Sequence, residues 1–210
     1  MREVLLLFGM QGSGKGTQAE RVMEKYQYEG ISVGQLLREK AETEPRISEA
    51  QQKGVLVPDD IVEATVEEKI ESLDASQKVL FDGFPRSERQ LEMYKRIAGR
   101  HEFKTLALMI NITEEEAIKR ISTRYTCPEC GAIGDAPGKC KCGTEMIRRK
   151  DDTEEAVKQR IAIFNKETTP LVKYFKEKGE FEEINGIGSY DEITQRIFDV
   201  LDRRHALKAQ

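Results

Sequence analysis

The first 17 residues constrain the fold of this chain most, because an apolar run passes directly into a glycine-rich loop that contains a lysine. Residues 4–8 read VLLLF, and residues 9–17 read GMQGSGKGT. An apolar run of this kind is typical of a strand buried on both faces of a parallel sheet. The glycines let the backbone wrap closely around a phosphate, while Lys15 and the N-terminus of a following helix add positive potential. The segment therefore predicts a strand, a phosphate-binding loop and a helix.

Two positions near this loop bear on metal binding. Gly16 occupies the place where Ser or Thr usually contacts Mg²⁺, and Thr17 comes one residue later. Asp82 follows a second apolar run, where such folds place an acid that orients Mg²⁺ and its waters. The alternative is that Asp82 is a strand-end turn residue before Gly83. An ordinary glycine-rich turn is the alternative for the loop itself, but it does not explain the lysine.

The rest of the chain alternates between apolar runs and charged amphipathic segments. Strands are predicted at residues 79–81, 106–110 and 181–184, and helices begin at capping boxes formed by Thr113 with Glu116 and Ser189 with Glu192. This alternation predicts an α/β fold with a parallel sheet flanked by helices and ligands at the carboxyl ends of the strands. Two stretches differ: residues 30–57 predict short helices without a clear strand, and residues 123–152 have little apolar content.

Length and charge narrow the class of protein. A chain of 210 residues predicts one main domain with small appendages. Its net charge of −4 and pI near 5.5 argue against a nucleic-acid-binding domain, which usually carries a strongly basic face. No apolar run approaches the ~20 residues that span a bilayer, and no signal-peptide cleavage site follows residues 4–8. We therefore expect neither a nucleic-acid nor a membrane partner, and a cytoplasmic location.

Three motifs together carry a resemblance to a known family. Residues 12–18 read GSGKGTQ, residues 82–86 read DGFPR and residues 149–152 read RKDD. In this order they resemble the adenylate kinases, specifically the long-lid form that contains zinc, over nearly the whole chain. The resemblance implies a P-loop nucleoside-monophosphate kinase fold. Its core would comprise residues 1–29, 58–122 and 153–210, with an AMP-binding segment at residues 30–57 and a lid at residues 123–152.

The resemblance also implies an activity and a set of site residues. Adenylate kinases transfer a phosphoryl group from Mg·ATP to AMP and give two ADP, and a monomer is expected. The implied catalytic residues are Lys15, Arg86, Arg120, Arg124, Arg149 and Arg160. The implied ATP-binding residues are Gly12, Ser13, Gly14, Lys15, Gly16, Thr17, Arg120 and Arg124. The implied AMP-binding residues are Val33, Arg38, Val55, Leu56, Val57, Gly83, Phe84, Arg86, Gln90, Arg149 and Arg160. Asp82 would orient Mg²⁺, and Asp151 and Asp152 would pair with lid arginines.

Several of these residues have simpler explanations. A single arginine is often a solvated side chain on a helix, although Arg120 and Arg124 lie four residues apart and should share one helix face. Gln90 fits a capping box with Ser87, whereas the family uses a glutamine there to bind the adenine of AMP. Asp151 and Asp152 could cap a helix that starts near Thr153.

The chain departs from the family pattern at several positions. Met10 and Gln11 replace the small residue and proline common in the loop, Val33 replaces a threonine, and Gln35 replaces an aspartate. Ile133 and Gly134 lie where lids often carry a polar or aromatic residue against ATP. These departures leave the phosphate chemistry intact but leave open another monophosphate as acceptor or GTP as donor.

The four cysteines of the chain are Cys127, Cys130, Cys140 and Cys142. A lid of ~30 residues is too small to fold on a hydrophobic core alone, and four thiolates in two closely spaced pairs suit structural Zn²⁺. Disulfides, a redox pair and Fe²⁺ are the alternatives. A zinc-ribbon module that binds nucleic acid would explain the cysteines and the nearby Arg148, but not the phosphate loop.

Overall fold

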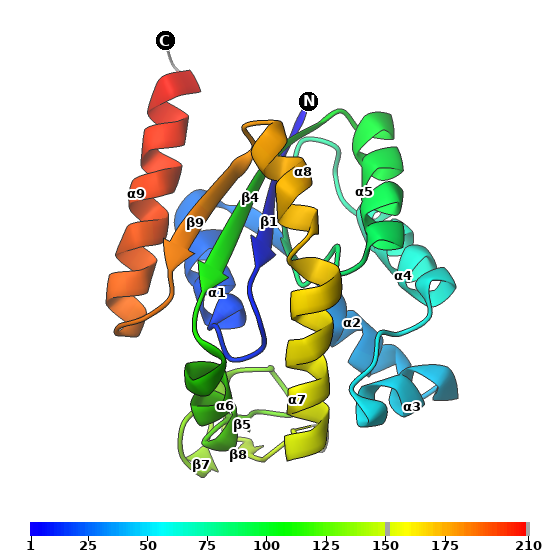
Figure 1. Ribbon diagram of the computed structural model, residues 1–210, viewed down its shortest axis with the longest axis vertical. Helices are drawn as coiled ribbons and strands as arrows, with labels where there is room; N and C mark the ends of the chain where they lie inside the picture. Colours follow the sequence, from blue (N-terminus) through cyan, green and yellow to red (C-terminus); the bar gives the residue numbers. More distant parts are fainter. Residues whose placement is uncertain (150–151, 209–210) are drawn as a thin grey trace.

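A five-stranded parallel sheet forms the centre of the molecule (Figure 1). The computed structural model describes residues 1–149 and 152–208. The strands are β1 (Arg2–Phe8), β2 (Tyr28–Ser32), β3 (Lys78–Asp82), β4 (Phe103–Asn111) and β9 (Phe181–Asn185), in the order β2-β3-β1-β4-β9. The four strands predicted from the sequence, β1, β3, β4 and β9, are confirmed. Because β1 lies in the middle, its carboxyl end opens between β3 and β4, where ligands bind in folds of this kind.

The helices cover both faces of the sheet and create two cores. Leu5 and Leu7 of β1 point to one face and pack with α1 and α9, whereas Val4 and Leu6 pack on the other face with α2–α5 and α8. The helix bounds are α1 (Lys15–Tyr26), α2 (Val33–Lys40), α3 (Pro45–Lys53), α4 (Asp59–Glu71), α5 (Glu88–Arg100), α8 (Leu171–Glu177) and α9 (Tyr190–Lys208). The predicted capping box of α9 is formed, because Ser189 N donates to Glu192 Oε2 and Glu192 N donates to Ser189 Oγ. The box predicted for α6 (Glu114–Ser122) is half formed: Thr113 Oγ1 accepts from Glu116 N, but the Glu116 carboxylate accepts from Arg120.

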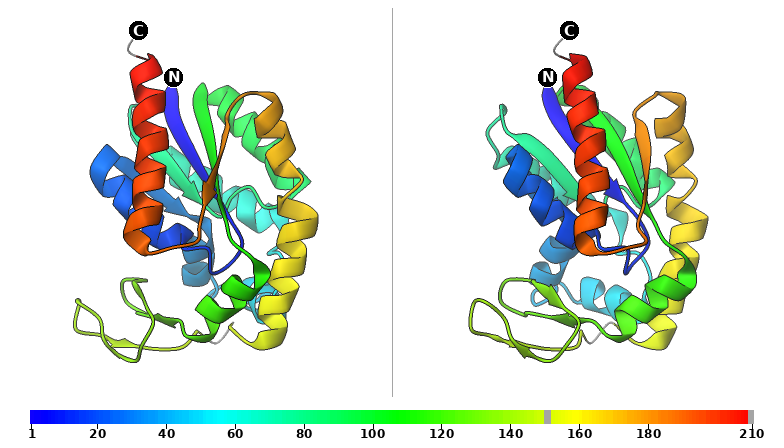
Figure 2. Two further views of the ribbon diagram at one scale, coloured as in Figure 1. Left: turned by 60° about the vertical axis from the view of Figure 1, so that its left-hand side comes forward. Right: turned by 90° about the vertical axis from the view of Figure 1, so that its left-hand side faces the viewer.

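A small unit projects beyond the carboxyl ends of the strands (Figure 2). It is supported by α6 (Glu114–Ser122) and α7 (Glu154–Ile163), and a π-helical turn (Phe164–Thr168) joins α7 to α8. The unit itself consists of two short antiparallel ladders, β5 (Tyr125–Thr126) with β6 (Ile133–Gly134) and β7 (Gly138–Lys139) with β8 (Glu145–Met146). We call residues 123–149 of this unit the lid.

The prediction that residues 30–57 contain no strand was wrong. Residues 28–32 form β2, which pairs in parallel with β3 at the edge of the main sheet. An edge strand is only partly buried, so it tolerates polar residues and glycine. In β2, Glu29 and Gly30 interrupt the apolar residues, and the sequence therefore has no continuous apolar run there. The expected start of the AMP-binding segment at residue 30 therefore falls inside the sheet, while α2 and α3 confirm the short helices.

Within the described part of the chain, every helix is either too short or too polar to cross a lipid bilayer.

Candidate active site

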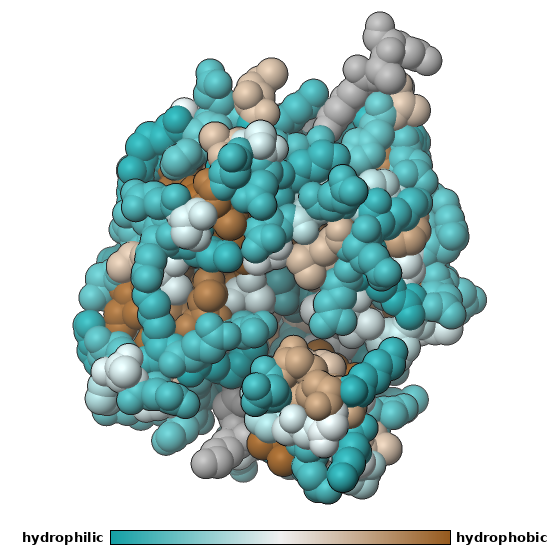
Figure 3. All heavy atoms as spheres, turned by 180° about the vertical axis from the view of Figure 1, so that it is seen from behind, coloured by the Kyte–Doolittle hydropathy of each residue, from teal (hydrophilic) through white to brown (hydrophobic). Residues whose placement is uncertain are grey.

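A cleft of about 940 Å³ lies between the carboxyl edge of the sheet, α2, α7 and the lid. Figure 3 shows the molecule from behind, hollowed between the main body and the lid. Lining residues come from the phosphate loop, from α2 and residues 54–57, from Asp82 and Arg86, and from the lid. The cleft therefore joins segments that lie far apart in the sequence.

The phosphate loop connects β1 to α1, as predicted. Lys15 donates to the carbonyl oxygens of Gly9 (2.5 Å) and Met10 (3.1 Å). Burial lowers the pKa of Lys15 to about 8; Asp82 opposes this shift, and Arg86 and Arg124 reinforce it. Lys15 is thus held inside the loop among positive groups, a position in which a phosphate would be strongly attracted.

Two loop residues show how closely the loop packs. Gly12 has a φ of +85°, and a Cβ there would lie 2.8 Å from the carbonyl oxygen of Ala117 in α6. Glycine is therefore required at this position. The Ser13 side chain is fully buried beneath the loop, so its predicted contact with ATP can only come from its backbone. Gly14, Gly16 and Thr17 line the cleft directly.

Asp82 lies beside the loop because of the sheet register. It is paired with Leu7 of β1, two residues before Gly9. A Cβ on Gly16 would lie 4.0 Å from Asp82 Oδ2 and 3.9 Å from Cδ1 of Ile133 in the lid. A carboxylate that faces the phosphate loop offers the oxygen ligand that Mg²⁺ prefers, so these residues fit a Mg–nucleotide complex.

Arg38 and Arg86 meet across the opposite part of the cleft. Both guanidinium groups lie next to Gly34 of α2: a Cβ atom built on this glycine would be 3.4 Å from Arg38 Nη1 and 3.7 Å from Arg86 Nη2. Arg86 donates to the Gly83 carbonyl (2.6 Å), and Thr168 of the π-helical turn donates to the Arg86 carbonyl (2.9 Å). The pKa of Arg86 is lowered because protein surrounds it; Asp82 opposes this effect, and Arg160 and Arg149 add to it. Two convergent guanidinium groups can bind one phosphate.

Gln90 follows neither sequence interpretation completely. Its backbone amide donates to Ser87 Oγ (3.3 Å), which confirms half of the capping box. Its side chain does not reach back to Ser87; Oε1 accepts from Arg86 N (2.8 Å) and Nε2 donates to Asp59 (3.4 Å). The side chain is 3% exposed and lines the cleft, so it links Arg86 to α4.

Arg120 and Arg124 do not share a helix face, contrary to the prediction. Helix α6 ends at Ser122 with Thr123 as its C-cap, so Arg124 lies beyond the helix. Arg120 is held by Glu116 (2.7 Å) and by the Gly186 carbonyl (3.0 Å). Both arginines nevertheless line the cleft.

Asp152 forms a largely buried ion pair with Arg124 where the lid joins α6 and α7, a region that we call the lid base. Arg124 donates to both of its oxygens at 2.6 Å, and their side chains are 11% and 7% exposed. Arg160 lies 3.8 Å from Oδ1. The cap of α7 is Thr153, which accepts from Ala156 N, so Asp152 does not cap the helix. Asp151 lies outside the described residues.

The remaining predicted residues divide into two groups. Those that line the cleft are Val33, Arg38, Val55, Leu56, Val57, Gly83, Arg149 and Arg160. The Phe84 side chain does not reach the cleft; it is 1% exposed and packs on Phe81 and Tyr94 because it belongs to the core. Any contact of Phe84 with AMP would therefore involve its backbone.

The four cysteines converge in the lid. Their sulfur atoms all lie within 4.8 Å of one another, and none is in a disulfide. Zn–S bonds of about 2.3 Å in a tetrahedron place sulfurs about 3.8 Å apart, so the cluster fits a four-thiolate metal site. Turns hold both pairs: Gly131 N donates to the Cys127 carbonyl (3.0 Å) and Gly143 N to that of Cys140 (2.8 Å). Arg148 is exposed, but it donates to the Ser122 carbonyl and lies over Tyr125, so it also links the lid to α6.

Sequence reasoning missed three contributors to the cleft. The segment Gly188–Tyr190 lines it beside Arg120, Thr168 holds the backbone of Arg86, and Gln11 donates to Asp152 (3.0 Å). The capping box of Ser189 with Glu192 predicted a helix start at the first of these, but not its place in the cleft. The other two depend on contacts between distant segments.

Comparisons with known proteins agree with this site. The sequence model of one family, described as adenylate kinase, matches residues 7–180. The chain is 36% identical to an adenylate kinase of Thermodesulfovibrio yellowstonii, covering 95% of this chain and 99% of that protein. It is 37% identical to one of Archaeoglobus fulgidus (95% and 98%) and 36% identical to one of Pyrococcus furiosus (94% and 95%). With the cleft, the phosphate loop and the lid in place, the chain belongs to the adenylate kinase family.

Proposed function

We propose that the protein transfers the terminal phosphoryl group of Mg·ATP to AMP and gives two ADP. One observation carries this proposal: a single cleft is lined by a phosphate loop with Lys15 at one end and by Arg38 and Arg86 at the other. Two phosphate-binding regions in one cleft suit two nucleotides that face each other. Relatives named adenylate kinase over nearly the full chain support the same activity.

The proposed mechanism rests on positioning and charge. Phosphoryl transfer needs in-line geometry and stabilisation of charge on the transferring group more than it needs covalent chemistry. AMP binds against α2, residues 55–57 and Gln90, with its phosphate between Arg38 and Arg86. ATP binds along residues 12–17 with Lys15 at its phosphates. Asp82 would hold Mg²⁺ through water when the metal is bound with ATP, and the metal would supply neutralisation of phosphate charge.

Four arginines complete the proposed catalytic set. Arg120, Arg124, Arg149 and Arg160 line the cleft between the two nucleotide regions and surround the transferring phosphoryl. The lid closes over ATP and excludes water, which suppresses hydrolysis. Asp152 holds Arg124 and Arg160 in place at the lid base, and we extend this role to Asp151.

We propose Zn²⁺ as the metal of the cysteine cluster. Four thiolates form a closed site, which is typical of structural zinc. Among described residues from 123 to 149, only Cys127 is buried, so the lid has no hydrophobic core of its own. Four clustered thiols that are not in disulfides also support a reducing, cytoplasmic location. We propose a monomer, as the resemblance to the family implies.

A coupled assay of ADP formation tests the activity. ATP is offered with AMP, CMP, UMP or GMP, and GTP is then offered as donor with the best acceptor. We expect strong preference for ATP with AMP, and loss of activity in Lys15→Met, the control that assigns the activity to this site. Preference for another base would change the substrate assignment, and no transfer to any monophosphate would overturn the proposal.

A further inference from the structure

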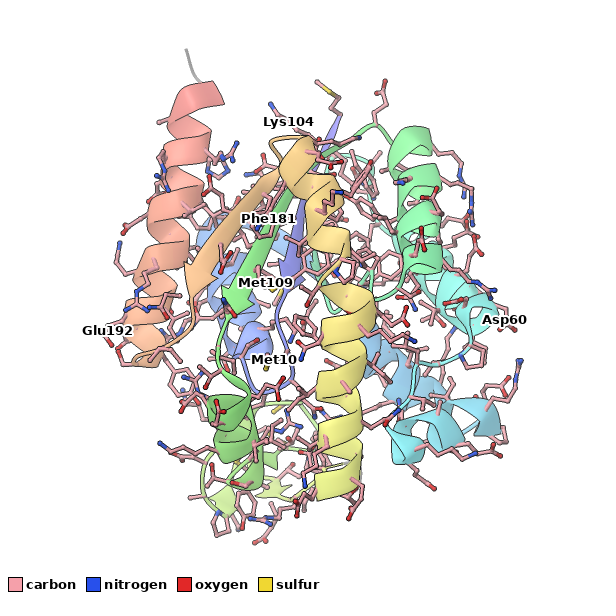
Figure 4. All side chains as sticks on the ribbon, viewed as in Figure 1. Met10, Asp60, Lys104, Met109, Phe181 and Glu192 are labelled. Carbon is pink, nitrogen blue, oxygen red and sulfur yellow. The ribbon has the colours of Figure 1, made fainter. Side chains whose placement is uncertain are left out.

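Met10 and Gln11, the two loop residues that depart from the family pattern, both contact the supports of the lid. Gln11 Nε2 donates to Asp152 Oδ1 at 3.0 Å, across 141 residues of sequence. Met10 is 8% exposed and packs with Ile121 of α6 and with Val157 and Ile161 of α7. Figure 4 shows Met10 beyond the carboxyl ends of β1 and β4, beside α7. The phosphate loop is therefore joined to both helices that carry the lid.

The Asp152 carboxylate is the point where these contacts meet. Its Oδ1 accepts from Arg124 Nη2 (2.6 Å) and Gln11 Nε2 (3.0 Å) and faces Arg160 Nη1 (3.8 Å). Its Oδ2 accepts from Nη2 (2.6 Å) and Nε (3.0 Å) of Arg124. Arg124 and Arg160 also line the cleft. Each guanidinium group has several N–H donors, so Arg124 and Arg160 can contact Asp152 and an anionic phosphoryl group in the cleft together. Gln11 is a neutral donor, so it holds the carboxylate without drawing the phosphoryl group away from the arginines.

The chemistry of the amide sets its orientation. The NH₂ group faces the carboxylate because a carbonyl oxygen there would oppose a negative charge. A glutamate at position 11 would bring two carboxylates together, and a proline could not donate. The side chain of Gln11 is therefore matched to Asp152 in this chain.

We propose that Met10 and Gln11 brace the phosphate loop against the lid base, and that Gln11 is a positioning residue for phosphoryl transfer. Gln11 holds Asp152 so that Arg124 and Arg160 remain aimed at the transferring group. This inference rests on the proposed function, because it requires that those arginines meet the phosphoryl. It predicts an effect on turnover that does not pass through AMP binding.

The substitution Gln11→Leu tests the inference, because leucine has a similar size and cannot donate. We expect kcat to fall about 3- to 10-fold, the size of the net contribution of one typical hydrogen bond, with KM for AMP within 2-fold of wild type. The melting temperature should stay within about 3 °C of wild type. The matched control is Gln195→Leu, which removes a glutamine–aspartate hydrogen bond to Asp199 (2.7 Å) on the surface of α9 and should leave kcat unchanged.

A double-mutant cycle with Asp152→Ala separates positioning from general packing. If Gln11 acts through Asp152, Gln11→Leu has no further effect on kcat in the Asp152→Ala background. Equal effects in both backgrounds, or wild-type kcat in Gln11→Leu, would overturn the inference. If Gln11→Leu does not fold, Gln11→Ala takes its place in the same cycle. Absence of transfer in the wild-type protein would instead mark failure of the proposed function.

Discussion

At the scale of single residues, the surroundings of Lys15 decide its charge. Burial lowers its pKa to about 8, whereas lysine in an unfolded chain titrates near 10.5. In the free protein the ammonium is therefore charged below pH 8 and loses its proton as the pH rises through 8. The phosphates of ATP favour the charged form, so binding raises the pKa again.

This shift predicts proton uptake on ATP binding above pH 8. The uptake equals the fraction of Lys15 that has lost its proton in the free protein. It is almost zero at pH 7 and about 0.9 proton per ATP bound at pH 9. Calorimetric titration with ATP in buffers of different ionisation enthalpy measures the uptake directly. Lys15→Arg, which stays charged, is the control and should show almost none at either pH. Wild-type uptake that does not change between pH 7 and pH 9 would contradict the prediction.

Arg124 combines a proposed catalytic role with a structural one. The resemblance to the family implied a catalytic role for Arg124, and its pair with Asp152 is in addition largely buried. Arg124→Ala leaves that carboxylate with weaker partners, and breaking a buried pair typically destabilises by about 3 kcal/mol. We expect both a loss of stability and a 10³-fold or larger loss of kcat.

The double variant Arg124→Ala/Asp152→Ala separates the two roles. Removing the unpaired carboxylate should restore most of the stability in urea unfolding, because no buried charge is left without a partner. The rate should remain low, because the arginine is still missing. Recovery of kcat in the double variant would show that Arg124 does not act on the phosphoryl group.

At the scale of elements, the lid differs from the rest of the protein. Two-residue ladders and one buried residue, Cys127, cannot stabilise it, so its order depends on the cysteine cluster. The sheet and its helices have two extensive cores that do not involve the lid. Lid and core should therefore lose structure independently.

Cys127→Ser should release the metal and unfold the lid while the core persists. We expect about one zinc per chain in the wild type and much less in the variant, measured by elemental analysis. Hydrogen exchange should become fast in residues 125–147 and stay slow in β1 and β4. Lys141→Ala, between Cys140 and Cys142, is the control and should keep its metal. Unchanged metal content and exchange in Cys127→Ser would exclude the metal-stabilised lid.

At the scale of the whole molecule, most of α9 stabilises the fold, although Tyr190 and Ile193 at its start also line the cleft. Ile197 is fully buried between α9 and the sheet, and Gln18 of α1 bonds to Tyr190 (3.0 Å) and Thr194 (2.8 Å). Ile197→Ala should reduce the free energy of unfolding by about 2–4 kcal/mol in urea denaturation. Well below the transition, kcat should stay within 2-fold of wild type. A large loss of kcat without loss of stability would place α9 in the catalytic cycle.

The sequence alone determined the features that depend on neighbouring residues. Continuous apolar runs predicted β1, β3 and β4, and the loop of residues 9–17 predicted the phosphate site, because strand burial and phosphate wrapping are local properties. The prediction of β9 rested on a shorter stretch that two glutamates interrupt. The spacing of the four cysteines likewise predicted their convergence. Edge strand β2 escaped detection because partial burial does not require an apolar run.

Only the tertiary structure decided which distant groups meet. The pairing of Arg124 with Asp152, the position of Phe84 in the core and the contact of Gln11 with the lid base depend on how α6, α7 and the loop pack together. The lowered pKa of Lys15 also has this origin, since its burial and its charged neighbours come from several segments. Desolvation and charge–charge interactions depend on distance in space, which the order of residues along the chain does not specify.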